Sequence, residues 1–366
     1  MHLADIAPSI FSTLGVPDSQ NRMDIAPSPT GRECLFLIDG LGASAIKDYG
    51  DLLPNISAML SYGSLQTSFP STTATALTTL TTGQLPGAHG MLGYTVRVPR
   101  SGGRILNALK WDERVDPLMW QPVPTLFEIA QSSGVTVSHI AAKRYENSGF
   151  TRAAFRGAEY KGANILSELV NEAKKALTSS PSFAYVYVND VDVAGHSDGV
   201  GSEKWLAALS FVDLVAESLI AKLPKGTRFW ITADHGMINA EEKIVIGENN
   251  PLLNSVETVA GEPRARHVYL PADQINHADE VAQSWRNFLG ERADIYTRQE
   301  VIDAGYFGEV VTEDSRDRIG DVLAIARGNT VLIEADRKDQ ESNMVGHHGG
   351  LTDSEKLIPL FSCEVN

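Results

Sequence analysis

Three apolar runs of this chain are each followed closely by an aspartate. The aspartates are Asp39, Asp192 and Asp234, and the runs are 33–38, 182–188 and 228–232. If these runs are parallel strands, their carboxyl ends meet at one edge of a sheet, where open α/β proteins bind ligands. One aspartate after a strand is commonly a turn residue. Three at one edge, with histidines nearby, favour a metal site.

Histidines stand where they could join these aspartates. His196 comes four residues after Asp192, so one helical turn or a tight loop would present both side chains to one cation. His235 follows Asp234 directly. Near the C-terminus, His347 and His348 precede two glycines and offer one further imidazole. Carboxylates and imidazoles are ligands for divalent cations, and the absence of any Cys-x-x-Cys pair excludes a thiolate zinc site.

A hydroxyl-rich block, Phe-Pro-Ser-Thr-Thr-Ala-Thr-Ala at 69–76, contains the candidate nucleophiles. Its proline, with Ser71 or Thr72, predicts the start of a helix. A hydroxyl in the first turn would lie among backbone N–H groups without partners, and such groups bind phosphate oxygens. A threonine hydroxyl attacks poorly at neutral pH, but coordination to a divalent cation lowers its pKa.

The remaining sequence predicts the scaffold that these side chains need. Apolar runs alternate with amphipathic stretches, which is the pattern of an α/β fold with a mainly parallel sheet flanked by helices. We expect strands at 33–38, 135–141, 182–188 and 228–232, further strands at 321–326 and 330–334, and helices at 165–177 and 205–223.

Residues 251–317 have a different pattern. Short strands at 267–270 and 294–297 flank a helix at 278–289, which predicts a small α+β cap beside the main sheet. The metal-binding catalytic core then comprises residues 1–250 and 318–366. We expect the cap to influence the choice of substrate.

Composition restricts the class of function. The formal net charge of −15 argues against binding to nucleic-acid polymers or anionic membranes, although bound cations would still admit a small phosphate-containing substrate. The chain has only two cysteines, Cys34 and Cys363, which suits a reducing compartment. We see no secretory signal and no apolar run of the ~20 residues that a membrane span needs, so we expect a cytoplasmic protein. The sequence does not predict the oligomeric state.

Taken in order, the motifs resemble those of the alkaline phosphatase superfamily, and within it the nucleotide pyrophosphatase/phosphodiesterase family. The shared motifs are Asp39-Gly, the Phe-Pro-Ser-Thr-Thr block, His89-Gly90, Asp192-x-x-x-His196, Asp234-His235-Gly236 and His348-Gly349, and they extend over residues 39–349. The resemblance implies two divalent metal ions, zinc first and manganese as the alternative.

The resemblance also implies a role for each residue. Asp192, His196 and His348 would hold one ion, while Asp39, Asp234, His235 and the Thr73 oxygen would hold the other. Thr73 is implied over Thr72 because the family's nucleophile stands three residues after the proline. His348 is implied over His347 because the family's histidine directly precedes glycine. His89 and Asp190 then have structural roles.

One position departs from the family pattern. Many members carry a phosphate-binding asparagine five residues after the histidine of the His-Gly block, and this chain has Tyr94 there. A phenol can donate one hydrogen bond but reaches further than an amide, so Tyr94 is a candidate for binding the substrate's phosphate, and its alternative is a packed aromatic. Lys143, just after the second predicted strand, is a further candidate for binding the substrate's phosphate, and its alternative is an ordinary solvated lysine.

These observations predict a hydrolase that cleaves phosphodiester or nucleotide pyrophosphate bonds through a phosphothreonine intermediate. A phosphonate hydrolase or a phosphomonoesterase is the alternative reaction, and a binding protein with a degenerate site is the alternative class. The residues after Thr73 are Ala74, Thr75, Ala76 and Leu77, with no cation among them. We therefore expect diesters to be preferred over monoesters, because a monoester brings more negative charge to the nucleophile.

Overall fold

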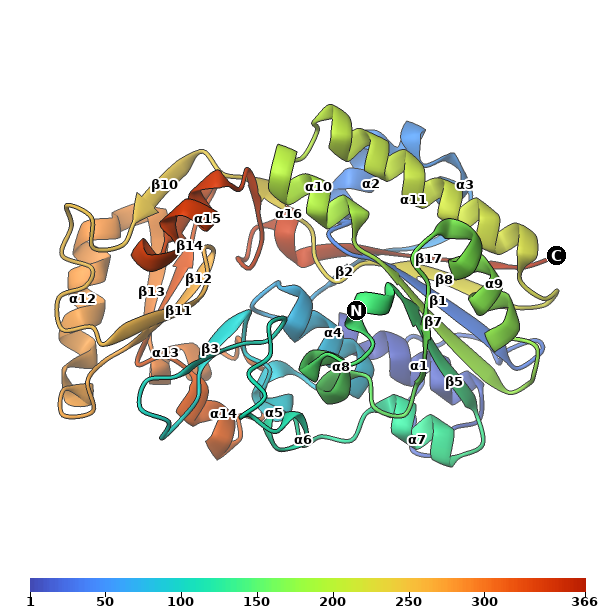
Figure 1. Cartoon of the computed structure of the whole chain (residues 1–366), viewed down its shortest axis with the longest axis horizontal. Helices are drawn as coiled ribbons and strands as arrows, with labels where there is room; N and C mark the ends of the chain where they lie inside the picture. The colour runs from blue at the N-terminus through green and yellow to red at the C-terminus, as the bar shows by residue number, and fades with distance from the viewer.

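The computed structural model describes residues 1–366, and its centre is a seven-stranded sheet with the order β2-β17-β8-β1-β7-β5-β6 (Figure 1). These strands are β1 (Arg32–Ile38), β2 (Leu60–Gln66), β5 (Thr136–Ala141), β6 (Glu159–Gly162), β7 (Ser182–Val188), β8 (Arg228–Thr232) and β17 (Leu357–Glu364). The five strands from β8 to β6 are parallel, whereas β17 is antiparallel to both of its neighbours. The predicted fold class is confirmed.

Helices cover both faces of this sheet, so its central strands are almost wholly buried (Figure 1). The helices of the first 200 residues are α1 (Ile6–Thr13), α2 (Ala43–Tyr49), α3 (Pro54–Ser57), α4 (Thr73–Thr82), α5 (Pro86–His89), α6 (Pro117–Trp120), α7 (Leu126–Ser132), α8 (Gly149–Ala154), α9 (Leu166–Ala176) and α10 (Asp190–Asp198). After them comes α11 (Glu203–Lys222), which packs beside α9. The expected helices 165–177 and 205–223 correspond to α9 and α11.

Helix α4 is buried at every position although it is rich in threonine. Two of its hydroxyls are satisfied within the helix, because Thr78 and Thr82 donate to the backbone carbonyls of Ala74 and Thr78, four residues earlier. The helix begins at Thr73, with Thr72 as its N-cap, and it ends at Gly83 in the left-handed conformation. Small side chains let this helix pack closely, and that packing fixes the position of its first turn.

A second, antiparallel sheet lies beside the first, with the order β11-β12-β14-β13 (Figure 1). Its strands are β11 (Thr258–Glu262), β12 (Ala265–Tyr269), β13 (Ala293–Thr297) and β14 (Val322–Ala326). Helix α12 (Ala278–Leu289) packs on this sheet through Trp285 and Leu289, forming a separate hydrophobic core. The remaining helices are α13 (Arg298–Asp303), α14 (Glu313–Arg318), α15 (Lys338–Asn343) and α16 (Asp353–Lys356).

Three two-stranded pairs connect these parts. They are β3 (Thr95–Arg97) with β4 (Ile105–Asn107), β9 (Ile238–Asn239) with β16 (Gly346–His347), and β10 (Glu242–Val245) with β15 (Thr330–Ile333). The second sheet extends beyond the cap predicted at 251–317, because its strand β14 lies after residue 317 and pairs with β12 and β13. The division into core and cap stays a proposal, with that sheet extending to residue 326. None of the helices combines the length and the apolar composition that a membrane-spanning helix needs.

Candidate active site

Two groups of possible metal ligands lie at the carboxyl edge of the parallel strands. One comprises Asp39, Asp234 and His235, and the other comprises Asp192, His196 and His348. Within each group, the ligand atoms all lie within 4.8 Å of one another. Each aspartate and histidine named from the sequence as a metal ligand thus falls into one of these groups, together with its expected companions.

The first group is assembled by the adjacent strands β1 and β8. Asp39 follows β1, while Asp234 and His235 follow β8, and His235 Nε2 lies 3.5 Å from a carboxylate oxygen of each aspartate. Gly40 has φ of +77°, and a Cβ there would lie 2.9 Å from the Cα of Asp192. A glycine is therefore needed for the β1 end to approach the second group closely.

Thr73 brings its hydroxyl to this first group. Its Oγ1 lies 3.2 Å from His235 Nε2, and the residue is only 7% exposed. Because Thr73 is the first residue of α4, the neighbouring backbone N–H groups have no acceptor in the preceding turn. Thr73 thus combines a hydroxyl beside a ligand group with a helix N-terminus suited to phosphate oxygens.

The second group is built on α10, which follows β7. His196 Nε2 lies 3.3 Å from Asp192 Oδ1, so both side chains face the same side of one helical turn. His348, from the loop after β16, places its Nε2 3.2 Å from His196 Nε2 and 3.6 Å from Asp192 Oδ1. The rings of His235 and His348 stack with centroids 3.7 Å apart, so the two groups are neighbours.

The three imidazoles are held in one orientation by backbone carbonyls. The Nδ1 atoms of His196, His348 and His235 lie 2.8, 2.9 and 3.1 Å from the carbonyl oxygens of Gly346, Ser71 and Gly236. A carbonyl oxygen only accepts, so each Nδ1–H donates and each Nε2 keeps its lone pair for a cation.

Buried carboxylate oxygens without partners indicate that cations fit here. Asp39 Oδ1, Asp192 Oδ1 and Asp234 Oδ2 are buried and make no hydrogen bond. Burial and the nearby carboxylates of Asp234 and Asp192 raise the pKa of Asp39 well above its ordinary value. Burial likewise raises the pKa of Asp192 and of Asp234. Two divalent cations would satisfy these oxygens and offset the repulsion among the three carboxylates.

The loop carrying His348 is fixed from two sides. Ser71 Oγ donates to the carbonyl of Gly350 and accepts from the Gly349 N–H, at 2.8 and 3.1 Å. The buried Glu355 accepts from the Gly350 N–H and forms a two-pronged ion pair with Arg264, which follows β11. The second sheet therefore helps to position a candidate metal ligand of the first.

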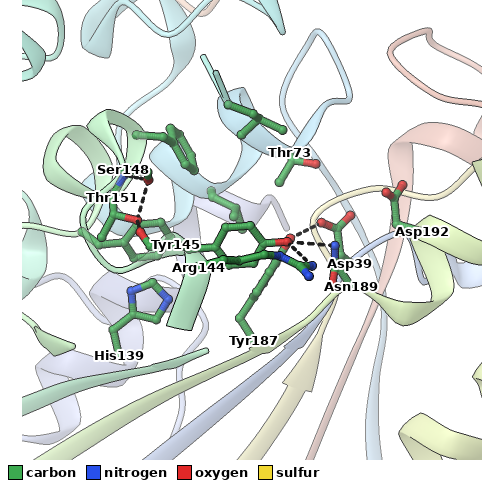
Figure 2. A pocket seen from close by; sticks show the side chains of 14 residues that line it. Asp39, Thr73, His139, Arg144, Tyr145, Ser148, Thr151, Tyr187, Asn189 and Asp192 are labelled. Atoms are coloured by element: carbon green, nitrogen blue, oxygen red, sulfur yellow. Dashed lines mark hydrogen bonds between the residues drawn. The ribbon is translucent and has the colours of Figure 1, made fainter. Parts of the chain in front are cut away.

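Two cavities meet at Thr73. The first, of about 290 Å³, extends between the end of the sheet and α8, and the second, of about 240 Å³, extends under the second sheet. Thr73, Leu109 and Asp192 line both of them. Figure 2 shows Thr73, Asp39 and Asp192 at one end of the first cavity.

The two residues predicted to contact substrate have different positions. Tyr94 lines the second cavity; its backbone N–H donates to Glu262, and its ring lies 5.3 Å from the Arg337 guanidinium. Lys143 is exposed and lines neither cavity, so the geometry adds no support to the expectation that it reaches the phosphate. Its neighbour Arg144 lines the first cavity instead.

Sequence reasoning missed several cavity residues. Arg144 and Asn189 both donate to the Tyr145 hydroxyl, at 2.7 and 3.2 Å, and Tyr187 donates to Asp39 Oδ2 (Figure 2). Tyr187 and Asn189 could have been found, since both lie at the end of β7, next to the end of β1. Arg144 and Tyr145 carry no such signal.

Glu262, from β11, was also missed. It is 4% exposed, and burial raises its pKa to about 8. Gly349 has φ of +122°, and a Cβ there would lie 2.5 Å from Glu262 Cγ. The glycine after His348 thus makes room for this buried acid in the second cavity.

Comparisons with known proteins show which family the sequence matches. The family model described as type I phosphodiesterase / nucleotide pyrophosphatase matches residues 34–351. The mouse ectonucleotide pyrophosphatase/phosphodiesterase family member 1 is 26% identical over 256 residues, which are 63% of this chain and 27% of that protein. The rat family member 3 is 25% identical over 262 residues, 65% of this chain and 29% of that protein. The chain thus corresponds to little more than a quarter of the length of these relatives.

Two solved structures share the fold. Murine ectonucleotide pyrophosphatase/phosphodiesterase 5 superposes with a TM-score of 0.71 at 16% identity, covering 90% of this chain and 87% of that one. Phosphonoacetate hydrolase from Sinorhizobium meliloti 1021, in complex with phosphonoformate, superposes with a TM-score of 0.69 at 17% identity, covering 92% and 90%.

The two adjacent histidines allow a direct test of the second group. His348→Ala removes an Nε2 that faces Asp192 and His196, whereas His347 lies in β16 outside both groups. We expect His348→Ala to lose about one equivalent of bound divalent metal, as measured by plasma emission spectrometry on protein purified without chelator. His347→Ala is the matched control and should keep the wild-type content. Equal losses from both variants would contradict the assignment of His348.

Proposed function

The chain belongs to the type I phosphodiesterase/nucleotide pyrophosphatase family, and within it we propose a hydrolase that uses Thr73 to cleave phosphodiester or pyrophosphate bonds. The observation that carries the proposal is the position of Thr73. Its hydroxyl lies 3.2 Å from His235 Nε2, beside one ligand group, at the junction of two cavities.

Two divalent cations would be held by the groups described above, Asp39, Asp234 and His235 for one and Asp192, His196 and His348 for the other. When bound, such ions lower the pKa of a coordinated hydroxyl and offset the charge that develops on the entering and departing oxygens. Zinc suits the mixed carboxylate and imidazole ligands, and manganese is the alternative.

The protein's own residues then perform the bond exchange. Thr73 Oγ1 loses its proton to solvent and forms a bond to phosphorus as the bond from phosphorus to the departing oxygen breaks; this leaves Thr73 esterified, and the departing oxygen takes up a proton from solvent. For a diester, this ester of Thr73 still carries the second organic group. In the second step a water oxygen bonds to phosphorus as the bond from phosphorus to Thr73 Oγ1 breaks, which restores the Thr73 hydroxyl and releases the second group as its phosphate monoester. The N–H groups at the start of α4 hold the non-bridging oxygens in both steps.

The pair of cavities supports a substrate with two substituents. A diester or pyrophosphate can direct one substituent into each cavity from a phosphorus beside Thr73, whereas a monoester fills only one. The first cavity has an aromatic and apolar lining that includes Tyr145 and Phe155, while Arg337 and Gln340 line the second. We propose that the substituent remaining on Thr73 occupies the first cavity and the departing one occupies the second, beside His348.

Phosphonate cleavage is the second candidate, and one observation favours it. Although no cation follows Thr73 in sequence, Arg144 lines the same cavity. A guanidinium there would attract the extra negative charge of a phosphonate with a carboxylate, or of a monoester. The fold is also similar to that of a phosphonoacetate hydrolase.

Removing the proposed nucleophile should separate chemistry from metal binding. Thr73→Ala deletes the attacking oxygen but leaves Asp39, Asp234 and His235 in place. We expect hydrolysis of bis-(p-nitrophenyl) phosphate to fall by about 10³-fold or more. Metal content should stay near two equivalents per chain, and the unfolding temperature should hardly change. If Thr73→Ala keeps most activity and Thr72→Ala loses it, the nucleophile is the preceding residue.

Arg144 and Lys143 form a matched pair for testing substrate charge. We expect kcat/KM for bis-(p-nitrophenyl) phosphate to exceed that for p-nitrophenyl phosphate at one pH. Arg144→Ala should lower cleavage of the monoester and of phosphonoacetate more than that of the diester, because their additional charge gains more from a cation. Lys143→Ala alters an exposed neighbour that does not line the cavity. It should leave the rates for the monoester and for phosphonoacetate, each relative to the diester, unchanged. If the wild type cleaves phosphonoacetate or the monoester faster than the diester, and Arg144→Ala loses that advantage, the diester assignment is wrong.

A further inference from the structure

A histidine lies at the end of the first cavity that is remote from Thr73. Figure 2 shows His139 and Thr151 at one end of the lining residues and Thr73 and Asp192 at the other. His139 belongs to β5 and is 4% exposed. It lies outside both metal-ligand groups, and the proposed bond exchange does not use it.

The imidazole of His139 is held by aromatic rings. Its ring stacks on Phe155 with centroids 4.3 Å apart, and Tyr160 and Tyr185 contact it edge-on at 4.7 and 5.1 Å. These contacts fix the orientation of the ring, and they would equally suit a phenyl group. Packing alone therefore gives no reason for a polar ring at this position.

Neither ring nitrogen of His139 has a hydrogen-bond partner within the protein. Nδ1 is also sealed from solvent, which leaves Nε2 as the nitrogen that a ligand can reach. Burial lowers the pKa of His139 to about 3, so near neutral pH the ring is uncharged and offers one N–H donor and one lone pair. A ligand in the cavity can therefore pair with Nε2, while Nδ1 stays unpaired in the aromatic cluster.

The other polar groups at this end of the cavity are already engaged. Ser148 Oγ donates to Thr151 Oγ1, which in turn donates to the carbonyl of Tyr145. The Tyr145 hydroxyl accepts from Arg144 and Asn189. His139 thus has no protein partner in a part of the wall that also contains Leu77, Phe150 and Phe155.

We propose that His139 is a specificity-determining residue, which hydrogen-bonds the organic group that stays on phosphorus and so selects a flat ring with a hydrogen-bonding edge. The aromatic wall accepts a flat ring, and Nε2 of His139 distinguishes rings that can hydrogen-bond from those that cannot. This inference rests on the proposed function, because it takes the first cavity as the site of the retained substituent.

The test compares two substrates that differ only in the edge of the ring. They are the p-nitrophenyl 5′-phosphate of thymidine and the same ester of its difluorotoluene isostere, which has nearly the same shape but lacks the hydrogen-bonding groups. We expect wild type to prefer the thymidine ester, mainly through KM. In His139→Phe that preference should fall by about tenfold, the effect of losing one buried hydrogen bond. His139→Gln, which keeps a donor and an acceptor, should retain part of it.

The controls separate recognition from folding. Thermal unfolding should show that His139→Phe is at least as stable as wild type, since a phenyl ring fills the same aromatic cluster without an unpaired nitrogen. His277→Phe, which changes an exposed histidine before α12, should leave the substrate preference unchanged. The proposal would be overturned if His139→Phe lowered kcat/KM equally for both esters, or if it left the preference unchanged. His139 would then have only a packing role.

A second readout keeps this test independent of turnover. If wild type hydrolyses neither ester, the proposed function has failed, and the binding claim is then decided by equilibrium binding of the two 5′-monophosphates to wild type and to Thr73→Ala. Tighter binding of the thymidine compound, lost in Thr73→Ala/His139→Phe, would support the role of His139. Equal binding of the two compounds, or no binding of either, would overturn it.

Discussion

Repulsion among three buried carboxylates is the constraint on which this site depends. Asp39, Asp192 and Asp234 are at most 9% exposed, and each leaves one oxygen without a partner. Burial raises the pKa of all three, and for Asp39 the two neighbouring carboxylates raise it further. Such an arrangement is unfavourable alone and becomes favourable with cations between the ligands. Two local features hold the ligands close enough to share cations. They are the close approach of the chain at Gly40 and the backbone carbonyl groups that orient the imidazoles.

The acidic half of the site could be predicted because strand periodicity fixes where a parallel strand ends. Asp39 and Asp234 follow β1 and β8, adjacent strands whose register places their ends together. Arg144 could not be predicted over Lys143, because both belong to a short 3-10 turn (Lys143–Tyr145), in which successive side chains diverge by about a third of a rotation.

The apolar run of β14 suits either sheet, and its pairing with β12 is a contact between residues far apart in sequence. The antiparallel pairing of β17 with β8 also joins residues far apart in sequence, so the sequence did not predict it.

The second sheet does more than cover the first. Arg264, at its β11–β12 turn, pairs with Glu355 in a fully buried contact that also holds the loop of His348. Glu262, from the same strand pair, lies against Gly349 and accepts a hydrogen bond from Tyr94. Substitutions in this sheet can therefore change the shape of the second cavity without touching a metal ligand.

The central claim is that Thr73 forms a covalent ester with phosphorus, and the stereochemical course at phosphorus tests it most directly. A diester made chiral with sulfur is hydrolysed in ¹⁸O-labelled water, and the configuration of the product is determined. Two successive in-line displacements, first by Thr73 and then by water, each invert phosphorus, so the account predicts net retention. Net inversion would mean that water attacks the substrate directly, and it would contradict the role of Thr73 as nucleophile.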